Sequence, residues 1–326
     1  MQAIQTANLS KTYWYYEKKS GLSGSLKALL RGRKVLLEAV RNVTMELALG
    51  EVVGFIGPNG AGKTTTLKML SGILHPTEGT VTVMGFTPSE RKKDFLKHIT
   101  FVSGQRNRLF WDLPAAEFFE FCRVVYAIPA DVFQERLQKL VALAEIGAIL
   151  NVPQRKLSFG QRKRCELAAG LLHDPKVIFL DEPTNAMDLI NAGKIRKFIR
   201  ELGEGGRHTI ILTSHNMSDI EQVCDRVIVI NQGQIVFDGD MRALQRLDGF
   251  NKQIRIVFDG PWSVARIQEM GVIRQMSGSE ILLEVAPDDA TALASRLLSE
   301  FAVKDISITE PRLEAIIENI FARRTG

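Results

Sequence analysis

A glycine-rich segment offers the clearest chemistry in this sequence. Residues 57–64 read Gly-Pro-Asn-Gly-Ala-Gly-Lys-Thr, which matches the pattern G-x-x-x-x-G-K-[ST]. Glycines permit backbone conformations that point successive N–H groups at phosphate oxygens. The segment follows the apolar run Glu51–Gly57 and opens a stretch with helical spacing, so the positive end of a helix reaches the same place. The pattern therefore predicts a cradle for nucleotide phosphates.

Side chains of this segment predict two further contacts. Lys63 is long enough to reach the β- and γ-phosphates, and the Thr64 hydroxyl is a ligand for Mg²⁺. The predicted nucleotide-binding positions here are Gly57, Pro58, Asn59, Gly60, Ala61, Gly62, Lys63, Thr64 and Thr65. A phosphate loop alone leaves kinases, GTPases and helicases open as alternatives.

A strand that ends in two acids supplies the next candidates. Val177–Glu182 is four apolar residues followed by Asp181 and Glu182. A buried parallel strand carries such acids to the carboxyl edge of its sheet, where ligands bind in α/β folds. We expect Asp181 to hold Mg²⁺, directly or through water, and Glu182 to polarise the water that attacks ATP.

The segment Leu157-Ser-Phe-Gly-Gln161 lies between the phosphate loop and the acidic strand and precedes a helix rich in Arg, Leu and Ala. With these motifs in this order, the sequence resembles the ABC ATPase family over roughly residues 4–238. The family signature usually reads Leu-Ser-Gly-Gly-Gln, so Phe159 replaces a glycine here. Ser158, Gly160 and Gln161 remain, and the resemblance implies that they contact ATP. Because these three remain, we expect the function to be retained with altered packing at the dimer interface.

The resemblance assigns four more positions. Gln105, in FVSGQ, matches the Q-loop glutamine that senses Mg²⁺ and the γ-phosphate, and His215, in LTSHN, matches the switch histidine. Both join Glu182 as predicted catalytic residues. Asn185–Asp188 resembles the D-loop that crosses the dimer interface, and Tyr13 lies where the family stacks an aromatic ring on adenine.

The family also implies partners and a mechanism. Two ATP molecules are held between two such domains, each phosphate loop facing the signature of the other copy, so this chain needs a second ATPase subunit, and a homodimer suffices. The aromatic stretch Arg106–Pro114, the insert after Tyr13 and the extra C-terminal domain resemble ATPases of ABC-2 type exporters. These drive separate integral membrane permeases, so we expect a peripheral protein at the cytoplasmic face of the cell membrane.

Composition limits the remaining possibilities. The net charge is +5, and residues 17–34 alone carry six basic residues and one acid, so the remaining 36 basic and 36 acidic residues balance. The charge thus lies in one segment rather than on a broad nucleic-acid face, and we expect no nucleic-acid partner. That basic segment, with its leucines, is expected to lie against anionic headgroups or the permease, or to be a solvated loop. The N-terminus lacks the basic-then-apolar order of a signal peptide. We expect the three scattered cysteines to be reduced core thiols.

The strands and helices that position these residues alternate, which predicts an α/β fold. We expect a P-loop NTPase of the ABC ATPase type, with a mainly parallel sheet core, an antiparallel β subdomain and a helical subdomain over 114–149. The pattern changes near residue 241. We therefore expect an ATP-binding domain over 1–240 and a small α+β, possibly ferredoxin-like, accessory domain over 241–326.

Two alternatives stay open. One is an importer motor of the same family, which requires a solute-binding protein. The other is a soluble ABC ATPase that acts on ribosomes or DNA, but the first of those types usually carries two cassettes and the second a long coiled coil, and neither feature occurs in this sequence.

Overall fold

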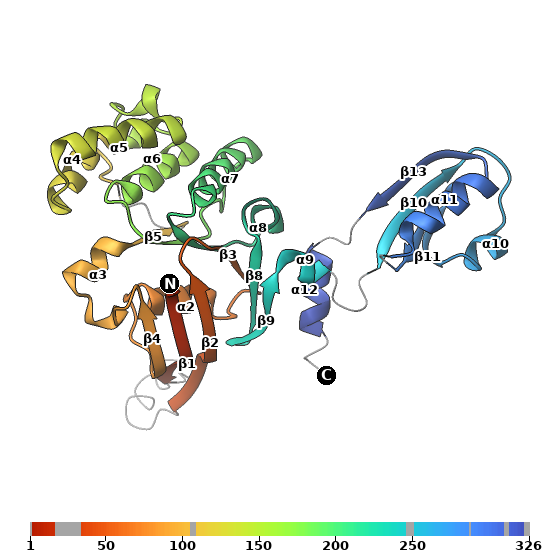
Figure 1. Ribbon diagram of the computed structural model, residues 1–326, viewed down its shortest axis with the longest axis horizontal. Helices are drawn as coiled ribbons and strands as arrows, with labels where there is room; N and C mark the ends of the chain where they lie inside the picture. The colour runs from red at the N-terminus through yellow and green to blue at the C-terminus, as the bar shows by residue number, and fades with distance from the viewer. Residues whose placement is uncertain are drawn as a thin grey trace, which may run out of the picture. The chain divides into compact units, whose positions relative to one another are not determined.

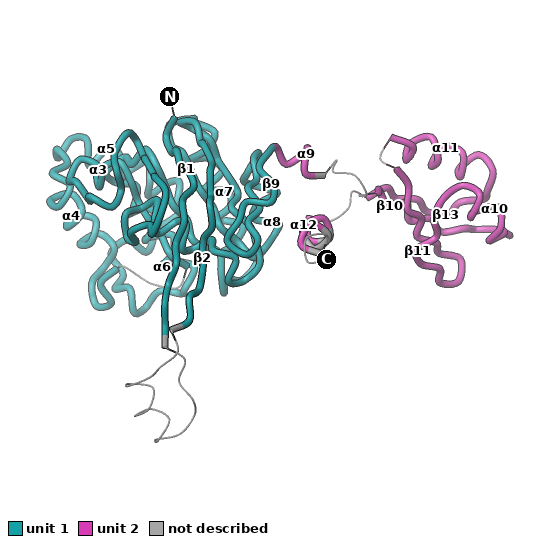
Figure 2. The backbone as a smooth tube through the Cα atoms, turned by 90° about the horizontal axis from the view of Figure 1, so that it is seen from below, with its two compact units in different colours: residues 1–239 teal, residues 240–326 magenta. Residues whose placement is uncertain are grey.

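The computed structural model describes residues 2–16, 34–104, 109–245, 251–286, 288–309 and 313–322. The chain divides into two compact units, residues 1–239 and residues 240–326 (Figures 1 and 2). Gln105 and nearly all of the basic segment 17–34 lie outside the described residues, so the expectations placed on them are not addressed by the structure.

A six-stranded sheet forms the centre of the first unit. Its strand order is β5-β6-β7-β3-β8-β9, and the neighbouring strands from β5 to β8 in this order pair in parallel. The strands are β3 (Val52–Ile56), β5 (Ile99–Ser103), β6 (Val177–Asp181), β7 (Thr209–Thr213), β8 (Arg226–Asn231) and β9 (Gln234–Asp240). Every residue of β6 and β7 is buried, as expected for parallel strands covered on both faces.

A three-stranded antiparallel sheet lies beside it. Its order is β2-β1-β4, with β1 (Gln2–Tyr16), β2 (Lys34–Ala48) and β4 (Glu78–Val83). Apolar side chains of both sheets and of helix α2 (Lys63–Leu70) form one buried cluster. The phosphate loop leads from β3 into α2, so this shared core fixes both of its ends.

Helices make up the rest of the first unit. A helical region contains α4 (Ala115–Val125), α5 (Ala130–Leu143) and α6 (Phe159–Leu171), in yellow and green in Figure 1. Further elements are α3 (Lys93–His98), α7 (Leu189–Glu204), α8 (Met217–Val223) and the short 3-10 helices η1 (Pro88–Glu90), η2 (Gly147–Ile149) and η3 (Gln154–Lys156). The predicted fold class, with its parallel core, antiparallel β subdomain and helical subdomain, is confirmed. The three cysteines are free and buried.

The second unit holds a smaller α+β module. Four antiparallel strands in the order β11-β12-β10-β13 form its sheet: β10 (Lys252–Phe258), β11 (Val272–Ser277), β12 (Glu280–Val285) and β13 (Val303–Thr309). With α10 (Val264–Gln268) and α11 (Ala290–Glu300), this is the split βαβ arrangement. Two helices flank the module in sequence, α9 (Met241–Gln245) and α12 (Leu313–Ala322), and they pack against each other.

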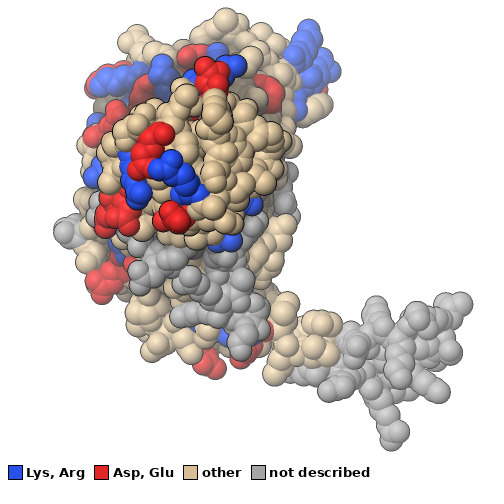
Figure 3. All heavy atoms as spheres, turned by 90° about the vertical axis from the view of Figure 1, so that its right-hand side faces the viewer, with Lys and Arg blue, Asp and Glu red and all other residues tan. Residues whose placement is uncertain are grey.

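Charged side chains are mixed on the module. Arg255 of β10 donates hydrogen bonds to Glu280 of β12 and to Asp305 of β13, and Arg274 pairs with Glu284. On the side of the molecule that faces the viewer in Figure 3, basic and acidic side chains lie next to one another. The ion pairs of Arg255 and Arg274 together link all four strands of the sheet. Within the described residues, no helix of the chain is long and apolar enough to cross a membrane.

Candidate active site

The phosphate loop has the backbone that its glycines predict. Gly60 and Gly62 have φ angles of +79° and +107°, in the left-handed region that favours glycine. Gly57 is required for a different reason, because a Cβ there would lie 2.1 Å from the carbonyl oxygen of Ile230. Helix α2 begins at Lys63, so its free N–H groups face the loop as expected. Pro58, Asn59 and Gly60 are exposed, Ala61 is buried, and Thr64 and Thr65 are half-buried in the first helical turn.

Lys63 bends back over the loop. Its Nζ donates to the carbonyl oxygens of Gly57 at 2.7 Å and Pro58 at 3.1 Å, in the space that phosphate oxygens would share. Burial lowers the pKa of this ammonium, and the negative charges of Glu182 and Asp181 partly oppose that shift. The two carboxylates therefore help to keep a buried cation charged beside the cradle.

Asp181 joins three elements at the carboxyl edge of the sheet. The Thr64 hydroxyl from α2 donates to its two carboxylate oxygens at 3.0 and 3.1 Å, and the Thr213 hydroxyl from β7 donates to Oδ1 at 2.9 Å. Thr64 and Asp181 thus present a hydroxyl and a carboxylate to one point, which is the hard-oxygen donor set that Mg²⁺ prefers. The described residues contain no cluster of three or more His, Cys, Asp or Glu that could hold a metal ion.

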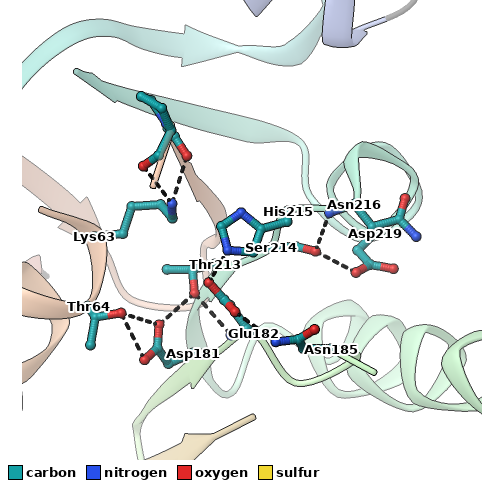
Figure 4. A network of polar contacts seen from close by, with 12 residues as sticks. Lys63, Thr64, Asp181, Glu182, Asn185, Thr213, Ser214, His215, Asn216 and Asp219 are labelled. Carbon is teal, nitrogen blue, oxygen red and sulfur yellow. Dashed lines mark hydrogen bonds and ion pairs between the residues drawn. The ribbon is translucent and has the colours of Figure 1, made fainter. Parts of the chain in front are cut away.

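Glu182 and His215 meet directly. His215 Nε2 lies 2.5 Å from Glu182 Oε1, and Asn185 Nδ2 donates to Glu182 Oε2 at 3.2 Å. The Glu182 backbone has a φ of 56°, a left-handed conformation that is uncommon for a residue with a side chain. Its N–H holds that conformation by donating to Thr213, both to the carbonyl and to the hydroxyl at 3.0 Å. Figure 4 shows Lys63 and Thr64 facing Asp181, Glu182 and His215.

Sequence reasoning missed a buried carboxylate behind this pair. Asp219 of α8 is 1% exposed and accepts hydrogen bonds from Thr184 and, at 2.8 Å, from Arg196. It also accepts one from the Ser214 hydroxyl at 2.6 Å (Figure 4). Ser214 precedes His215, and Thr184 follows Glu182 by two residues. Asp219 therefore fixes both loops that carry the Glu182–His215 pair. Asp219 lies far along the chain from Thr184 and Arg196, so no sequence motif links these residues.

The signature segment opens α6 with a complete cap. The Ser158 hydroxyl accepts from the Gln161 N–H at 3.2 Å, and the Gln161 side chain accepts from the Ser158 N–H at 2.8 Å, a capping box. Gly160 packs against Asn191 so closely that a Cβ would lie 2.5 Å from the Asn191 side chain.

Two predicted residues remain, Tyr13 on β1 and Asp188 at the start of α7. Tyr13 lies on β1 and pairs with Leu37 of β2. Two residues after Leu37, the carbonyl oxygen of Ala39 packs against Gly62 of the phosphate loop. The Lys11 ammonium lies 5.4 Å from the centre of the Tyr13 ring, and no ligand contact tests its predicted role. Asp188 caps α7 through a hydrogen bond from the Asn191 N–H at 2.9 Å, which fixes the end of the predicted D-loop.

Comparison with known proteins agrees with this geometry. Residues 40–185 match the family model described as ABC transporter, and residues 250–309 match the model described as EvrA-like ABC transporter, C-terminal domain. The ABC transporter ATP-binding protein NatA of Bacillus subtilis is 32% identical over 65% of this chain and 86% of its own length. A fluoroquinolones export ATP-binding protein of Mycobacterium tuberculosis is 34% identical over 72% of this chain and 75% of its own.

A solved structure extends the likeness to the fold. The dimeric post-hydrolysis state of an ATP-binding cassette with bound ADP and Pi has a TM-score of 0.60 and 26% identity, covering 73% of this chain and 99% of that one. The chain belongs to the family of ABC transporter ATP-binding proteins, and its first unit is an ABC ATPase domain that binds and hydrolyses ATP.

Proposed function

We propose that this chain is the ATP-hydrolysing subunit of an ABC-2 type exporter, works as a homodimer and drives a separate membrane permease from the cytoplasmic face. The observation that carries the hydrolytic part is the Glu182–His215 contact of 2.5 Å beside Lys63 and Asp181. A carboxylate held by a histidine at a phosphate cradle is suited to activating water against a γ-phosphate.

The proposed reaction is in-line attack of water on the γ-phosphate of ATP. The Glu182 carboxylate accepts a proton from the attacking water, and His215 holds that carboxylate through Nε2. The Lys63 ammonium, released from the Gly57 and Pro58 carbonyls, offsets the charge that develops on the phosphate oxygens. Thr64 and Asp181 would hold Mg²⁺, with Gln105 as a further ligand, and the ion would neutralise phosphate charge when bound.

A second copy is proposed to complete each ATP site, with the signature of one chain placed against the phosphate loop of the other. We assign Ser158, Gly160 and Gln161 to the ATP bound by the partner copy, and Tyr13 to the adenine of the chain's own ATP. Exposed apolar side chains next to the D-loop support a protein interface: Leu189 and Ile190 are 82% and 75% exposed in the first turn of α7. The dimeric cassette with ADP and Pi supports the same arrangement.

An aromatic surface is the proposed permease contact. Phe110, Phe118 and Phe121 form a ring cluster with centroid separations of 5.4 to 5.9 Å, and Phe110, Trp111 and Phe121 are largely exposed. A cavity of about 240 Å³ lies between α3, β5 and the end of α4 at Tyr126. Exposed aromatic rings of this kind suit the apolar face of a short amphipathic helix of a permease. Export rather than import is supported by the name of the fluoroquinolones export relative.

The test is association with a permease in membranes. Phe121→Ala, in the aromatic surface, is expected to weaken co-purification with a permease and to reduce permease-stimulated ATP hydrolysis, with ATP affinity unchanged. Tyr15→Ala is the matched control, because Tyr15 is equally exposed but lies on β1. Equal loss from both variants, or from neither, contradicts the assigned surface. Inside-out vesicles that accumulate substrate on ATP addition identify export, and a requirement for a solute-binding protein identifies import.

A further inference from the structure

A buried lysine joins the signature helix to a neighbouring strand. Lys163, one turn into α6, is 3% exposed, and its Nζ lies 2.6 Å from Glu166 Oε2 of the same helix. The same Nζ also donates to the carbonyl oxygen of Ser103, the last residue of β5. One ammonium therefore ties α6 to the strand that leads directly into Gln105.

The Ser103 end of β5 is in turn fixed to the hydrolytic acids. Ser103 pairs with Asp181 in the parallel sheet, and the next N–H, from Gly104, donates to the Asp181 carbonyl at 2.7 Å. A Cβ on Gly104 would lie 2.1 Å from the carbonyl oxygen of Glu182, so the two strand ends are in close contact. A displacement of the Ser103 carbonyl is therefore transmitted to the backbone of Asp181 and Glu182.

The helix itself has little room to move against β5. Gly170, on the same helix, faces Thr100 of β5 so closely that a Cβ would lie 2.9 Å from its hydroxyl. Tight packing at both Lys163 and Gly170 makes α6 and β5 move as one body. A change at the N-terminus of α6, at Ser158, therefore reaches β5 along a rigid element.

We propose that Lys163 is a positioning residue that couples the signature of this chain to its own hydrolytic site. ATP held by the partner's phosphate loop against Ser158 fixes α6, and Lys163 carries that fixation to Ser103 and so to Glu182. The inference rests on the proposed dimer, and it adds a residue through which occupancy of one nucleotide site sets the geometry of the other.

Stability alone does not account for this lysine. A buried ion pair contributes little over apolar side chains of similar volume, whereas removal of one partner leaves a charge buried. The bond to the Ser103 carbonyl is a different matter, because only a donor at position 163 supplies it. Variants that remove the charge pair cleanly therefore separate a structural role from the coupling role.

The experiment uses the full chain in a Glu182→Gln background and measures ATP-dependent dimer formation. Lys163→Met with Glu166→Met removes both charges, and Lys163→Glu with Glu166→Lys keeps an ion pair but no donor at 163. Both doubles are expected to melt near the parent temperature and to need about tenfold more ATP for half-maximal dimer formation. Lys163→Arg keeps a donor at position 163 and is expected to form dimers at the parent's ATP concentration.

Each outcome has a separate meaning. Dimer formation by both doubles at the parent's ATP concentration overturns the coupling role of Lys163. Failure of the Glu182→Gln parent itself to form a dimer overturns the proposed function instead. Should a double variant unfold, hydrogen exchange of residues 99–104 is compared between Lys163→Met, which lacks the donor, and Lys163→Arg, which keeps it: protection lost only in Lys163→Met supports the role, and equal protection in both variants overturns it.

Discussion

The region around Asp181, Glu182 and His215, called here the hydrolytic corner, differs from the signature in where its hydrogen-bond partners come from. Around Asp181 and Glu182, the hydrogen bonds come from α2, β7 and the loop after β7, so distant parts of the sequence are needed to build it. At Ser158 and Gln161, both bonds of the capping box stay within one turn of α6. The corner is assembled by the whole unit, whereas the signature is assembled locally.

The difference shows what each region is prepared for. A corner held from several elements orients side chains for chemistry before ATP binds. A capped helix start presents N–H groups and a hydroxyl to a ligand that this chain does not itself place there. In the proposed dimer these are two unlike halves of one site, which a second copy joins.

The largest effect should come from the corner. Glu182→Gln is expected to lower kcat on the order of 10³-fold, because the amide cannot accept the proton of the attacking water. ATP binding should persist, since Lys63 and the loop backbone remain, and the ATP-bound dimer should accumulate. Steady-state hydrolysis and size-exclusion chromatography with ATP measure the two effects. Glu204→Gln is the control, because Glu204 is an exposed side chain at the end of α7. Rapid turnover by Glu182→Gln would remove the corner's assigned role.

Asp219→Asn should test whether the corner depends on its buried support. The amide leaves Arg196 without its carboxylate and is expected to cost about 3 kcal/mol of unfolding free energy, with a lower kcat. Asp238→Asn, in a partly exposed pair with Arg226, should cost about 1 kcal/mol or less. Urea denaturation compares the two variants. Equal losses would mean that Asp219 holds the corner no more firmly than a surface pair does.

Gly160→Ala should break the signature without touching the corner. Its methyl group would push on Asn191, which is bound to Asp188 by a 2.6 Å hydrogen bond, and such overpacking costs about 2 kcal/mol. ATP affinity should hold while ATP-driven dimer formation weakens. Gly193→Ala in mid-α7 meets only Arg196 at 3.8 Å and should stabilise the chain by about 0.5 kcal/mol. Normal dimer formation by Gly160→Ala would argue against the assigned role of the signature.

The smallest predicted effect is a loss of folding stability in acid, caused by His173 just after the C-terminal end of α6. Burial lowers the pKa of His173 from 6.5 to about 4, with Nε2 donating to the Ile99 carbonyl and the ring stacked on Tyr126. The unfolded chain then binds more protons between pH 4 and 6.5, so stability falls as pH falls through that window. From pH 7.5 to pH 6 the loss is about 1 kcal/mol. His173→Phe keeps the stack and should flatten this slope in urea denaturation. If the pH dependence of stability is unchanged in His173→Phe, it comes from groups other than His173.

Local rules made much of this predictable from sequence. Gly60 and Gly62, and the start of α2 at Lys63, follow from backbone conformation and helix ends, which are properties of neighbouring residues. The buried strands β6 and β7 follow from runs of apolar residues. The fold class followed from the order of such segments.

The unpredicted features share a dependence on distance along the chain. Asp219 meets Thr184 and Arg196, and Lys163 meets Ser103, across sequence separations that no spacing rule covers. Strand β5 was not predicted, because Ile99–Ser103 is short and mixes polar with apolar residues. Its pairing with β6, not its composition, makes it a strand.

The connections of the C-terminal module have a consequence for how such chains diverge. The module begins at β10 and ends at β13, where Gln253 pairs with Thr309, and the flanking helices α9 and α12 also pack together. The chain therefore leaves and returns at one place, the geometry in which whole modules are gained, lost or exchanged without rebuilding the host. The family model for residues 250–309 has almost the same limits. Replacement of 250–310 by a short linker should leave a folded ATPase, a ready scaffold for recombining one motor with other accessory modules.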